Sequence, residues 1–474
     1  MPLRNVRLWV GLFFAIRLVG IMQPPVEMAH SWRQTFTCMV ARNLVEVDFD
    51  LLHPRTDMAG DRPDVVASEF PFLNALIAMA IKTFGFAHWY GRLIVLLISS
   101  IGVLAFHAIV QRRYGERVAL LSALVLLASS WFMYGRKIMP DAFSISLVIM
   151  GLYFADRVVA GGNRWLLLPG MLLVALGGLC KMPAIVLGAL WPLFAWEAGL
   201  RSRAGRSLLM ASVLAVLPVA WWYFLWQPHL LETFGNQLYF PFAFRDGIRT
   251  LLDLWPLVLE KFYFSALRSF VALVFCLWGI RILAGRSPRE LSIVLAAVML
   301  PFLYFMVRTG DVFPRHDYYV LPVVPLMALV AGVGLAGLSR AWLRTALVVL
   351  ICAEGLLNQV HDLRWNTTNA YLLQAGALAD RFSGPHDLVA CNGDLDPRLI
   401  YYLHRKGWSL TNEELQRKET LEMLRSRGCR AIIVNLRHGA VDLPARLLYQ
   451  DEHYRVYLPQ AQEQIDGANG VLPE

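Results

Sequence analysis

Long apolar segments recur along the whole chain, and they constrain its fold more than any other feature. Each is close to the length that crosses the roughly 30 Å hydrocarbon core of a bilayer as a helix. A soluble protein would alternate polar and apolar residues, whereas here 57% of residues are hydrophobic and only 17% are charged. The sequence therefore predicts an all-α polytopic membrane protein with about eleven transmembrane helices. The predicted spans lie near residues 8–22, 92–111, 118–134, 142–158, 165–180, 184–198, 208–226, 264–283, 291–307, 318–337 and 341–359.

Arginine placement predicts the orientation of these helices. Arginine clusters fall in alternate gaps between the apolar segments, which the positive-inside bias makes cytoplasmic. The gaps between them then face outward, and an odd number of helices puts the C-terminus outside as well. We therefore predict a bacterial inner (plasma) membrane protein. The clusters are Arg4/Arg7, Arg112/Arg113/Arg117, Arg157/Arg164, Arg201/Arg203/Arg206, Arg281/Arg286/Arg289 and Arg340/Arg344.

The first outer loop, residues 23–91, is predicted to hold two helices. Residues 31–46 have amphipathic spacing, and residues 72–86 are apolar but short for a full crossing. We place the second of these helices at the membrane surface. If it crossed the membrane instead, every later helix would flip and the arginine clusters would fall outside.

A change of composition after Gln359 predicts two domains. Residues 1–359 form the transmembrane domain, and residues 360–474 form a small extracytoplasmic α/β domain. Within the second, we expect strands at 387–391, 430–435 and 454–458, and helices at 397–404 and 412–427.

Charge, cysteine content and repeats exclude several classes of protein. The net charge of +9 comes from short gaps between apolar segments, which is typical of cytoplasmic loops and excludes nucleic acid as a partner. The six cysteines show no CxxC and no metal-ligand spacing, so we predict neither a metal site nor a cofactor. Whether Cys391 and Cys429 pair is left open. We find no internal repeat, which disfavours a secondary transporter.

Cations in the outer gaps are informative because the positive-inside bias does not explain them. Arg136, Lys181 and Arg315 lie in such gaps. A lipid-phosphate sugar donor needs fixed cations, because the phosphate gains negative charge as the glycosidic bond breaks. We predict that these residues bind the donor phosphate. The alternative is that they only reach to phospholipid headgroups.

Outer-loop carboxylates are the candidates for a catalytic base that deprotonates or orients an acceptor hydroxyl. Glu27 follows the first helix, Glu69 precedes the predicted surface helix, and Asp141 follows a proline at the start of the fourth span. The alternatives are a solvated loop residue for Glu27 and a helix N-cap for Asp141. A purely structural role is a weaker alternative for Glu69 than for the other two acids, because Glu69 adjoins apolar sequence.

Residues 31–46 also carry candidate binding groups. Arg33 and Thr37 share one helical face, because they are four residues apart. Arg33 is suited to hold a phosphate bidentately, and Trp32 is suited to stack on a sugar or to anchor the helix at the interface. An interfacial anchor helix is the alternative for the whole segment.

Taken in order, these motifs resemble the GT-C glycosyltransferases, in particular the bacterial protein mannosyltransferase and aminoarabinose transferase enzymes of families 39 and 83. The resemblance spans nearly the full chain. It implies a GT-C fold and sugar transfer from a lipid-phosphate donor. The similar segments are 32–35 and 41–43, Glu69-Phe70-Pro71, Gly85 followed by Arg92, 135–141, Lys181-Met182-Pro183, 315–319 with Pro322 and Pro325, and Tyr401-Tyr402 with 405–408.

One departure from the family pattern concerns the base. The Asp-Glu pair at the start of the family's first outer helix falls near Arg33-Gln34 when the Ala-Arg-Asn runs are matched, so Glu27, Glu69 and Asp141 all stay candidates. The substrate-positioning residues that we expect are Trp32, Gln34, His316, Tyr318 and Tyr319.

The function predicted from the sequence is an integral membrane glycosyltransferase. It would transfer a hexose or pentose, with inversion, from a polyprenyl-phosphate donor to an extracytoplasmic lipid, glycan or protein acceptor. The alternatives are a transporter or flippase for an anionic lipid-linked substrate and a non-catalytic assembly protein. Transport would place polar or broken helices near the bilayer midplane, whereas most charges here lie at the predicted outer boundary.

Overall fold

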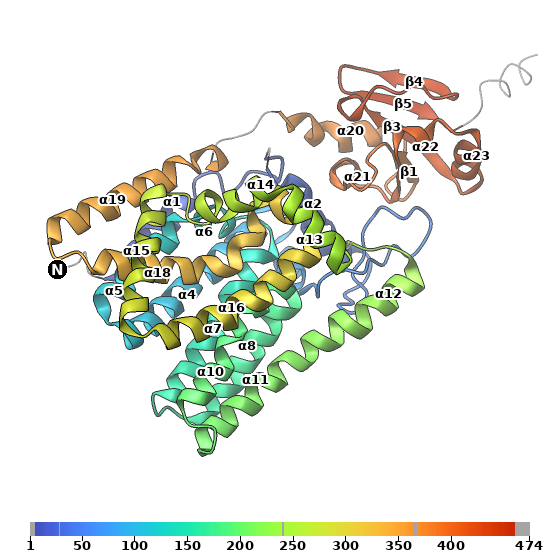
Figure 1. Cartoon of the computed structure of the whole chain (residues 1–474). Helices are drawn as coiled ribbons and strands as arrows, with labels where there is room; N and C mark the ends of the chain where they lie inside the picture. Colours follow the sequence, from blue (N-terminus) through green and yellow to red (C-terminus); the bar gives the residue numbers. More distant parts are fainter. Residues whose placement is uncertain (1–4, 28, 239–240, 364–367, 460–474) are drawn as a thin grey trace, which may run out of the picture.

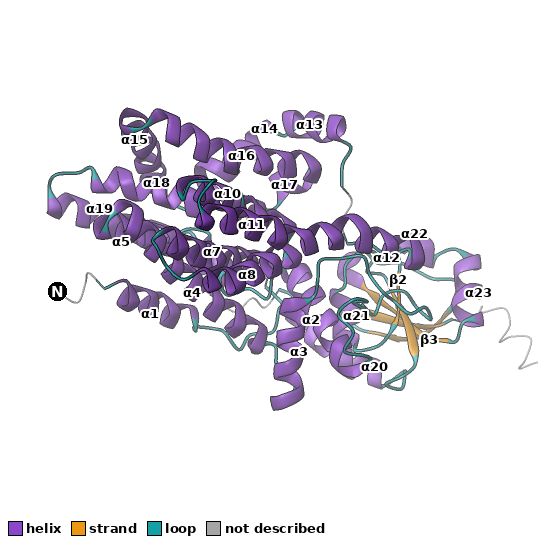
Figure 2. Cartoon of the chain, turned by 90° about the horizontal axis from the view of Figure 1, so that it is seen from below, coloured by secondary structure: helices purple, strands orange, loops and turns teal. Residues whose placement is uncertain are grey.

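A helical body and a small sheet domain make up this protein in a computed structural model (Figure 1). The structure describes residues 5–27, 29–238, 241–363 and 368–459. The N-terminal end of the chain lies on the side of the helical body that is far from the sheet domain (Figures 1 and 2). The predicted fold class, mostly helical with a small C-terminal α/β part, is confirmed at this level.

The first half of the helical body contains α1 (Val6–Arg17), α2 (Ser31–Glu46), α3 (Phe72–Phe84), α4 (Trp89–Tyr114), α5 (Glu116–Ala128), α6 (Trp131–Tyr134), α7 (Pro140–Val159), α8 (Leu167–Cys180), α9 (Ile185–Gly188), α10 (Leu190–Glu197) and α11 (Arg203–Trp221). The second half contains α12 (Gln227–Phe234), α13 (Phe244–Asp253), α14 (Trp255–Glu260), α15 (Phe270–Arg286), α16 (Pro288–Thr309), α17 (Val312–Arg315), the 3₁₀ helix η6 (Asp317–Val323), α18 (Val324–Ala336) and α19 (Ala341–Leu357).

Only part of the predicted membrane topology is confirmed. Among the described residues, five helices are long and apolar enough to cross a membrane. A sixth span results if Trp255–Ser265 and α15, which meet at a bend of 91°, are counted as one helix. Every predicted span overlaps a helix, but several of these helices are too short to qualify by themselves. The expected count of eleven crossings is therefore not confirmed. The five long helices are Trp89–Tyr114, Pro140–Val159, Arg203–Phe234, Pro288–Thr309 and Asp317–Ala336.

Charged side chains mark two opposite ends of the helical body. At one end, Arg112 and Arg113 of α4 both pair with Asp156 of α7. At the other end, Arg92 near the start of α4 pairs with Glu27, which follows α1. The 26 residues of α4 separate the two ends by about 39 Å. The Arg112/Arg113 cluster and Arg92 thus lie at opposite ends of α4. The alternation of the remaining clusters, and which end faces the cytoplasm, stay predictions.

Helix α7 holds a central position because glycines let its neighbours approach closely. A Cβ added to Gly177 of α8 would lie 2.6 Å from the carbonyl oxygen of Ser144, and one added to Gly102 of α4 would lie 2.7 Å from the side chain of Ser146. Contacts of this closeness exclude any larger residue and fix the position of α7 between α4 and α8. Its first turn is consequently a rigid platform for Asp141.

Helix α2 has the bounds that the sequence predicts, but its surroundings differ from the prediction. Nearly all of it is buried, including Arg33, Gln34, Arg42 and Asn43. The alternative of an interfacial anchor helix therefore does not describe α2, because such a helix would expose its polar face. The helix appeared amphipathic because its polar side chains alternate with apolar ones, and here the polar side chains are used in internal contacts. The predicted helix at 72–86 forms as α3.

The C-terminal domain is a five-stranded mixed sheet with short helices. The strand order is β2-β1-β3-β5-β4, in which β1 pairs in parallel with β2 and β3, and β5 pairs antiparallel with β3 and β4. Strands β1, β3 and β5 confirm the three predicted strands. Strands β2 and β4 were not predicted, because β2 is very short and none of the residues of β4 is buried. The predicted helix at 412–427 is divided into two. The elements are α20 (Ala375–Asp380), β1 (Leu388–Cys391), α21 (Arg398–Leu403), β2 (Gly407–Ser409), α22 (Asn412–Leu415), α23 (Lys418–Ser426), β3 (Cys429–Asn435), β4 (Arg446–Gln450) and β5 (Tyr454–Leu458).

Helix α2 joins the sheet domain to the helical body. The guanidinium of Arg42 lies 2.6 Å from Asp57 and donates to the carbonyl oxygen of Tyr401 at 3.0 Å. The indole of Trp32 donates to the carbonyl oxygen of Leu395 at 3.0 Å. Figure 2 shows α2 beside α21 at this junction. Contacts of this kind place the sheet domain over the end of the helical body that carries the predicted site residues. Cys391 and Cys429 are free thiols in the structure.

Candidate functional site

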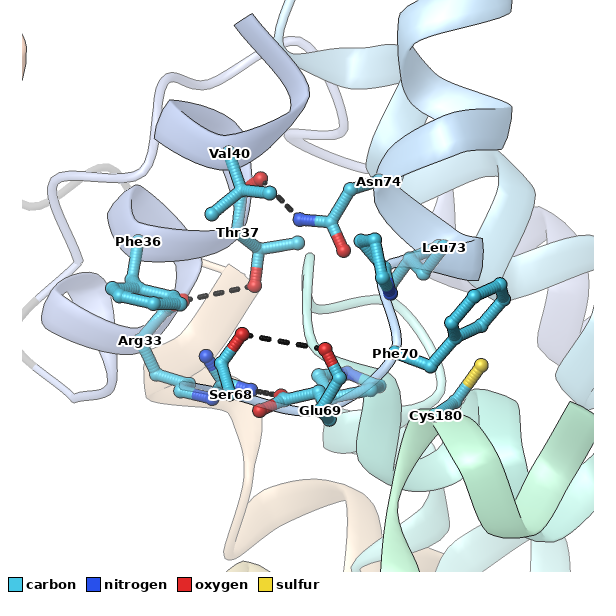
Figure 3. Close-up of a pocket in the computed structure, with 12 residues that line it drawn as sticks. Arg33, Phe36, Thr37, Val40, Ser68, Glu69, Phe70, Leu73, Asn74 and Cys180 are labelled. Carbon is cyan, nitrogen blue, oxygen red and sulfur yellow. Dashed lines mark hydrogen bonds and ion pairs between the residues drawn. The ribbon is translucent and has the colours of Figure 1, made fainter. Parts of the chain in front are cut away.

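Several of the predicted site residues lie where α2, α3, α7 and α8 meet. A narrow pocket lies at this junction (Figure 3), and it is walled by both polar and apolar side chains. Its lining residues are Arg33, Phe36, Thr37, Val40, Ser68, Glu69, Phe70, Pro71, Leu73, Asn74, Pro140 and Cys180. Among the described residues, no group of three or more histidine, cysteine or acidic side chains is arranged to hold a metal ion.

Arg33 and Glu69 form a buried ion pair across this pocket (Figure 3). Their side chains are 6% and 7% exposed, so each charge depends on the other for compensation. Asn74 of α3 donates to the carbonyl oxygen of Thr37 at 2.7 Å, which locks α3 against α2. The backbone NH of Phe70 donates to the carbonyl oxygen of Leu179 at 3.1 Å and ties the Glu69 segment to the end of α8.

Asp141 and Lys181 form a second buried pair beside the first. Pro140 begins α7 and Asp141 follows in its first turn, where the helix dipole favours a negative charge. The ammonium nitrogen of Lys181, just beyond the end of α8, lies 3.8 Å from Oδ1 of Asp141. The other carboxylate oxygen, Oδ2, is buried and makes no hydrogen bond within the described residues. A buried carboxylate oxygen in this state is able to accept a hydrogen bond from a substrate.

Aromatic side chains surround Lys181. Its ammonium nitrogen lies 5.6 Å from the ring centres of both Tyr318 and Tyr319. The ring of His316 stacks on Tyr318 at 5.3 Å, and that of His30 meets Tyr318 edge-on at 5.4 Å. These contacts bring residues from three distant parts of the sequence into one cluster.

Both histidines of this cluster are uncharged at neutral pH. Burial, and to a smaller extent the nearby Lys137 and His316, together lower the pKa of His30 to about 3. Burial also lowers the pKa of His316. The charge of Asp317 opposes this shift, and the charge of Lys181 adds to it. Because His30 Nε2 lies 2.9 Å from the hydroxyl of Tyr134, a neutral imidazole keeps one hydrogen bond satisfied there.

Acidification should destabilise the protein through His30. The folded state holds the pKa of His30 at about 3, below its ordinary value of 6.5, so its contribution is complete above pH 6.5 and is lost as the pH falls toward 3. Between pH 7 and pH 5 this loss amounts to about 2 kcal/mol. Thermal unfolding of the purified protein at the two pH values measures it. His30→Gln, which cannot titrate, should show a smaller pH dependence, and an unchanged dependence would refute the assignment.

Glu27 lies close to this cluster, but its two carboxylate oxygens have protein partners. Arg92 pairs with one oxygen, and the side-chain amide of Gln34 donates to the other at 3.0 Å. The amide oxygen of Gln34 in turn accepts from the backbone NH of Ile138 at 3.1 Å. Gln34 therefore connects Glu27 to the loop before α7, and its predicted contact with substrate is untested.

Removing Arg92 should strongly destabilise the fold, because it leaves the Glu27 carboxylate buried without its cation. We expect Arg92→Leu to lose about 3–5 kcal/mol of stability. The double variant Glu27→Leu/Arg92→Leu should lose less, since it buries no uncompensated charge. Denaturant or thermal unfolding of the single and double variants measures the difference, and equal losses would contradict this role of the pair.

Arg136 is buried, and its hydrogen bonds go to backbone groups. It donates to the carbonyl oxygen of Val19 at 2.8 Å and to that of Asp362 at 3.4 Å. Burial, and then the charge of Arg92, lower the pKa of Arg136 to about 10, so it is charged at neutral pH. Its predicted binding of donor phosphate is untested, and in this structure its contacts join three segments of the chain.

Arg315 and Trp32 lie at the edge of the cluster. The side chain of Arg315 is 64% exposed and lies 3.3 Å from Asp311, so it does not share the burial of Lys181. Trp32 stacks on Phe36 with ring centres 6.1 Å apart, in addition to its bond to the sheet domain. The phosphate-binding role predicted for Arg315 and the sugar-stacking role predicted for Trp32 both stay predictions.

Lys261, Arg268 and His30 belong to this region but were not among the residues predicted from the sequence. Asp317 pairs with Lys261 at 2.6 Å and with Arg268, which fixes the segment that carries His316 and Tyr318. Lys261 and Arg268 were not selected because they flank a single apolar segment and carry no motif of their own. His30 was missed as well, although it directly precedes the predicted helix. No local signal in the sequence identifies contacts between residues so far apart.

Part of the chain matches a known protein family. Residues 61–223 match the family model described as dolichyl-phosphate-mannose-protein mannosyltransferase. No match was found among curated protein sequences. The matched residues include the Glu69 segment, Asp141 and Lys181, so the family likeness covers the center of the cluster.

Solved structures show a related fold over nearly the whole chain. The chain is similar to ArnT from Cupriavidus metallidurans in the apo state, with 15% identity, a TM-score of 0.67, and coverage of 96% of this chain and 98% of that one. It is also similar to the same ArnT bound to undecaprenyl phosphate, with 15% identity, a TM-score of 0.59 and the same coverage. A third similar structure is the oligosaccharyltransferase AglB from Archaeoglobus fulgidus in complex with an inhibitory peptide and a dolichol-phosphate, with 10% identity, a TM-score of 0.53, and coverage of 90% of this chain and 69% of that one. The resemblance to GT-C glycosyltransferases that the motifs indicate is confirmed.

Proposed function

We propose that this protein with a GT-C fold is a membrane glycosyltransferase that uses a polyprenyl-phosphate-linked sugar. It transfers a hexosyl or pentosyl group, with inversion, to an extracytoplasmic lipid, glycan or protein. The observation that carries the proposal is the pairing of Asp141 with Lys181. A buried carboxylate with one oxygen lacking a hydrogen-bond partner in the described residues lies 3.8 Å from a buried ammonium group.

Asp141 is the base in this proposal. The oxygen of an acceptor hydroxyl attacks the anomeric carbon, and its proton passes to Oδ2 of Asp141. The bond from the anomeric carbon to the phosphate oxygen breaks, and its electron pair goes to the phosphate. Lys181 stabilises this developing charge, since a fixed cation in a dry site acts strongly on a departing phosphate.

The contacts of the three predicted acids favour Asp141 over the other two. Both oxygens of Glu27 have partners, and Glu69 is held by the guanidinium of Arg33. Oδ2 of Asp141 makes no hydrogen bond within the described residues, so an acceptor hydroxyl can donate to it without displacing a protein partner. Glu69 and Arg33 together are better suited to orient the donor or acceptor within the pocket.

The comparisons support the donor class. One similar ArnT structure contains undecaprenyl phosphate, one similar AglB structure contains a dolichol-phosphate, and the matching family model is described by a dolichyl-phosphate sugar. The long apolar helices provide the membrane setting in which such a lipid resides. We place the protein in a bacterial inner membrane with the site and the sheet domain on the periplasmic face.

A transfer assay tests the proposal. The wild type in proteoliposomes is given a panel of polyprenyl-phosphate donors with radiolabelled sugars, together with lipid, glycan and peptide acceptors from a bacterial envelope. We expect label to pass from one donor class to one acceptor class, and Glu69→Gln to reduce this transfer while the protein stays folded. If the wild type moves intact labelled donor across the bilayer and transfers no sugar to an acceptor, the protein is a flippase and not a glycosyltransferase.

A further inference from the structure

A groove on the outside of the helical body lies far from the candidate site. It lies between α15 and the turn after α18, and its surface is apolar except for one arginine. Trp278 and Leu277 are 50% and 60% exposed, so they contribute large apolar surfaces to the exterior of the protein. The lining residues are Val274, Phe275, Leu277, Trp278, Arg281 and Leu338.

Close helix packing makes this groove rigid. A Cβ added to Gly279 of α15 would lie 1.9 Å from the carbonyl oxygen of Val330, and one added to Gly334 of α18 would lie 2.1 Å from that of Phe275. The two helices therefore touch through their backbones and have little freedom to slide. The guanidinium of Arg344 donates to the carbonyl oxygen of Leu338 at 2.9 Å and holds the turn that closes the groove.

Arg281 is the charged group of this groove. It is exposed, and the described part of the chain offers it neither an ion pair nor a hydrogen bond. Arg281 stands five residues before the end of α15 at Arg286, within an apolar helix. An unpaired cation at such a depth is costly next to hydrocarbon unless it reaches a lipid phosphate. Trp278, one turn earlier, is suited to the level of the glycerol backbone.

The groove lies toward the end of the helical body opposite the candidate site. Helix α15 starts next to Arg268, whose partner Asp317 adjoins the His316 and Tyr318 cluster. Arg281 is twelve residues after Ser269, the N-cap of α15, which is about 18 Å along the helix. Arg281 thus lies past the middle of α15, nearer to its end at Arg286 than to its start beside Arg268. A lipid whose phosphate reaches Arg281 comes from the leaflet at that end of the helix.

We propose that this groove binds one anionic phospholipid of the leaflet opposite the candidate site. Its phosphate contacts Arg281, and one acyl chain lies along Leu277, Val274 and Phe275. Charge complementarity decides between anionic and zwitterionic lipids. The phosphate charge of an anionic lipid such as phosphatidylglycerol is not compensated within its headgroup, whereas the cationic choline of a zwitterionic lipid opposes the contact with arginine. The bound lipid would cover an exposed apolar surface and the unpaired cation together.

Native mass spectrometry of the purified full chain tests the site. The protein is titrated with phosphatidylglycerol or phosphatidylcholine of matched acyl chains, and the first bound lipid is quantified. We expect the wild type to bind phosphatidylglycerol more tightly than phosphatidylcholine. Arg281→Gln should lower the affinity for phosphatidylglycerol by about fivefold and have little effect on the affinity for phosphatidylcholine. Arg286→Gln is the matched control, because Arg286 is exposed on the same helix but does not line the groove.

Several outcomes would overturn the proposal. The proposal fails if the wild type binds the two lipids equally. It also fails if Arg281→Gln and Arg286→Gln lose the same amount of phosphatidylglycerol binding, because Arg281 then makes no specific contact with the phosphate. A dimer that is lost in Trp278→Ala would assign the groove to a second copy of the chain. Displacement of phosphatidylglycerol by an equal amount of a polyprenyl monophosphate would assign it to the lipid carrier instead. Thermal unfolding of each variant confirms that it is folded before its lipid binding is compared.

Discussion

Asp141→Asn lowers the rate of sugar transfer by about 10²- to 10⁴-fold, the range that a positioned general base contributes. The substitution keeps the size of the side chain and removes its ability to accept the acceptor's proton. Oδ2 of Asp141 has no hydrogen bond to protein in the described residues, so the change breaks no such bond at that atom. The measurement is the initial rate of transfer at saturating donor, with protein folding checked by thermal unfolding.

The matched control for this variant is Asp311→Asn. Asp311 is also an aspartate near this end of the helical body, but it is partly exposed and pairs with Arg315 at the surface. Its loss should leave transfer close to the wild-type rate. If Asp141→Asn transfers sugar as fast as Asp311→Asn does, Asp141 is not the base, and Glu69 becomes the next residue to test.

Lys181→Met lowers transfer by about 10²- to 10³-fold, which is the cost of removing one fixed group that stabilises developing negative charge. Methionine has a similar length and keeps the contacts with the rings of Tyr318 and Tyr319, so the loss reports mainly on charge. The measurement compares kcat with donor KM. A fall in kcat indicates that Lys181 acts on the departing phosphate in the transition state.

Arg315→Gln is the comparison that separates Arg315 from Lys181, which are two of the cations predicted to bind donor phosphate. Arg315 is 64% exposed, and a solvent-exposed charge acts weakly on a phosphate because water and salt screen it. We expect a small change in donor KM for Arg315→Gln. A loss of transfer equal to that of Lys181→Met would show instead that the loop carrying Arg315 reaches the donor.

The sequence was sufficient for the helical architecture because hydrophobic length is a local property. The bounds of α2, the helix at α3 and the three main strands of the C-terminal sheet follow from residue spacing alone. The number of crossings did not, because α9 and α10 are interrupted and α15 meets the helix before it at a bend of 91°. Breaks of this kind depend on neighbouring helices, and residue spacing does not encode them.

The candidate site was predictable only as a set of residue types. Their order placed Glu69, Asp141 and Lys181 in neighbouring outer gaps. The pairing of Arg33 with Glu69, however, joins residues 36 positions apart, one in α2 and one in the segment before α3. The same limit explains why Glu27 looked equivalent to Asp141. Only the folded arrangement, with Arg92 and Gln34 on the Glu27 carboxylate, separates the two.

A doubly labelled donor gives the most direct test of the proposed transfer. The donor carries tritium in its sugar and phosphorus-32 in its phosphate, and the wild type is assayed in sealed proteoliposomes beside Asp141→Asn. We expect one polyprenyl phosphate to be released for each sugar that joins the acceptor, and Asp141→Asn to lose both signals together. Transfer of both labels across the bilayer on one intact molecule, with no sugar joined to an acceptor, would contradict it.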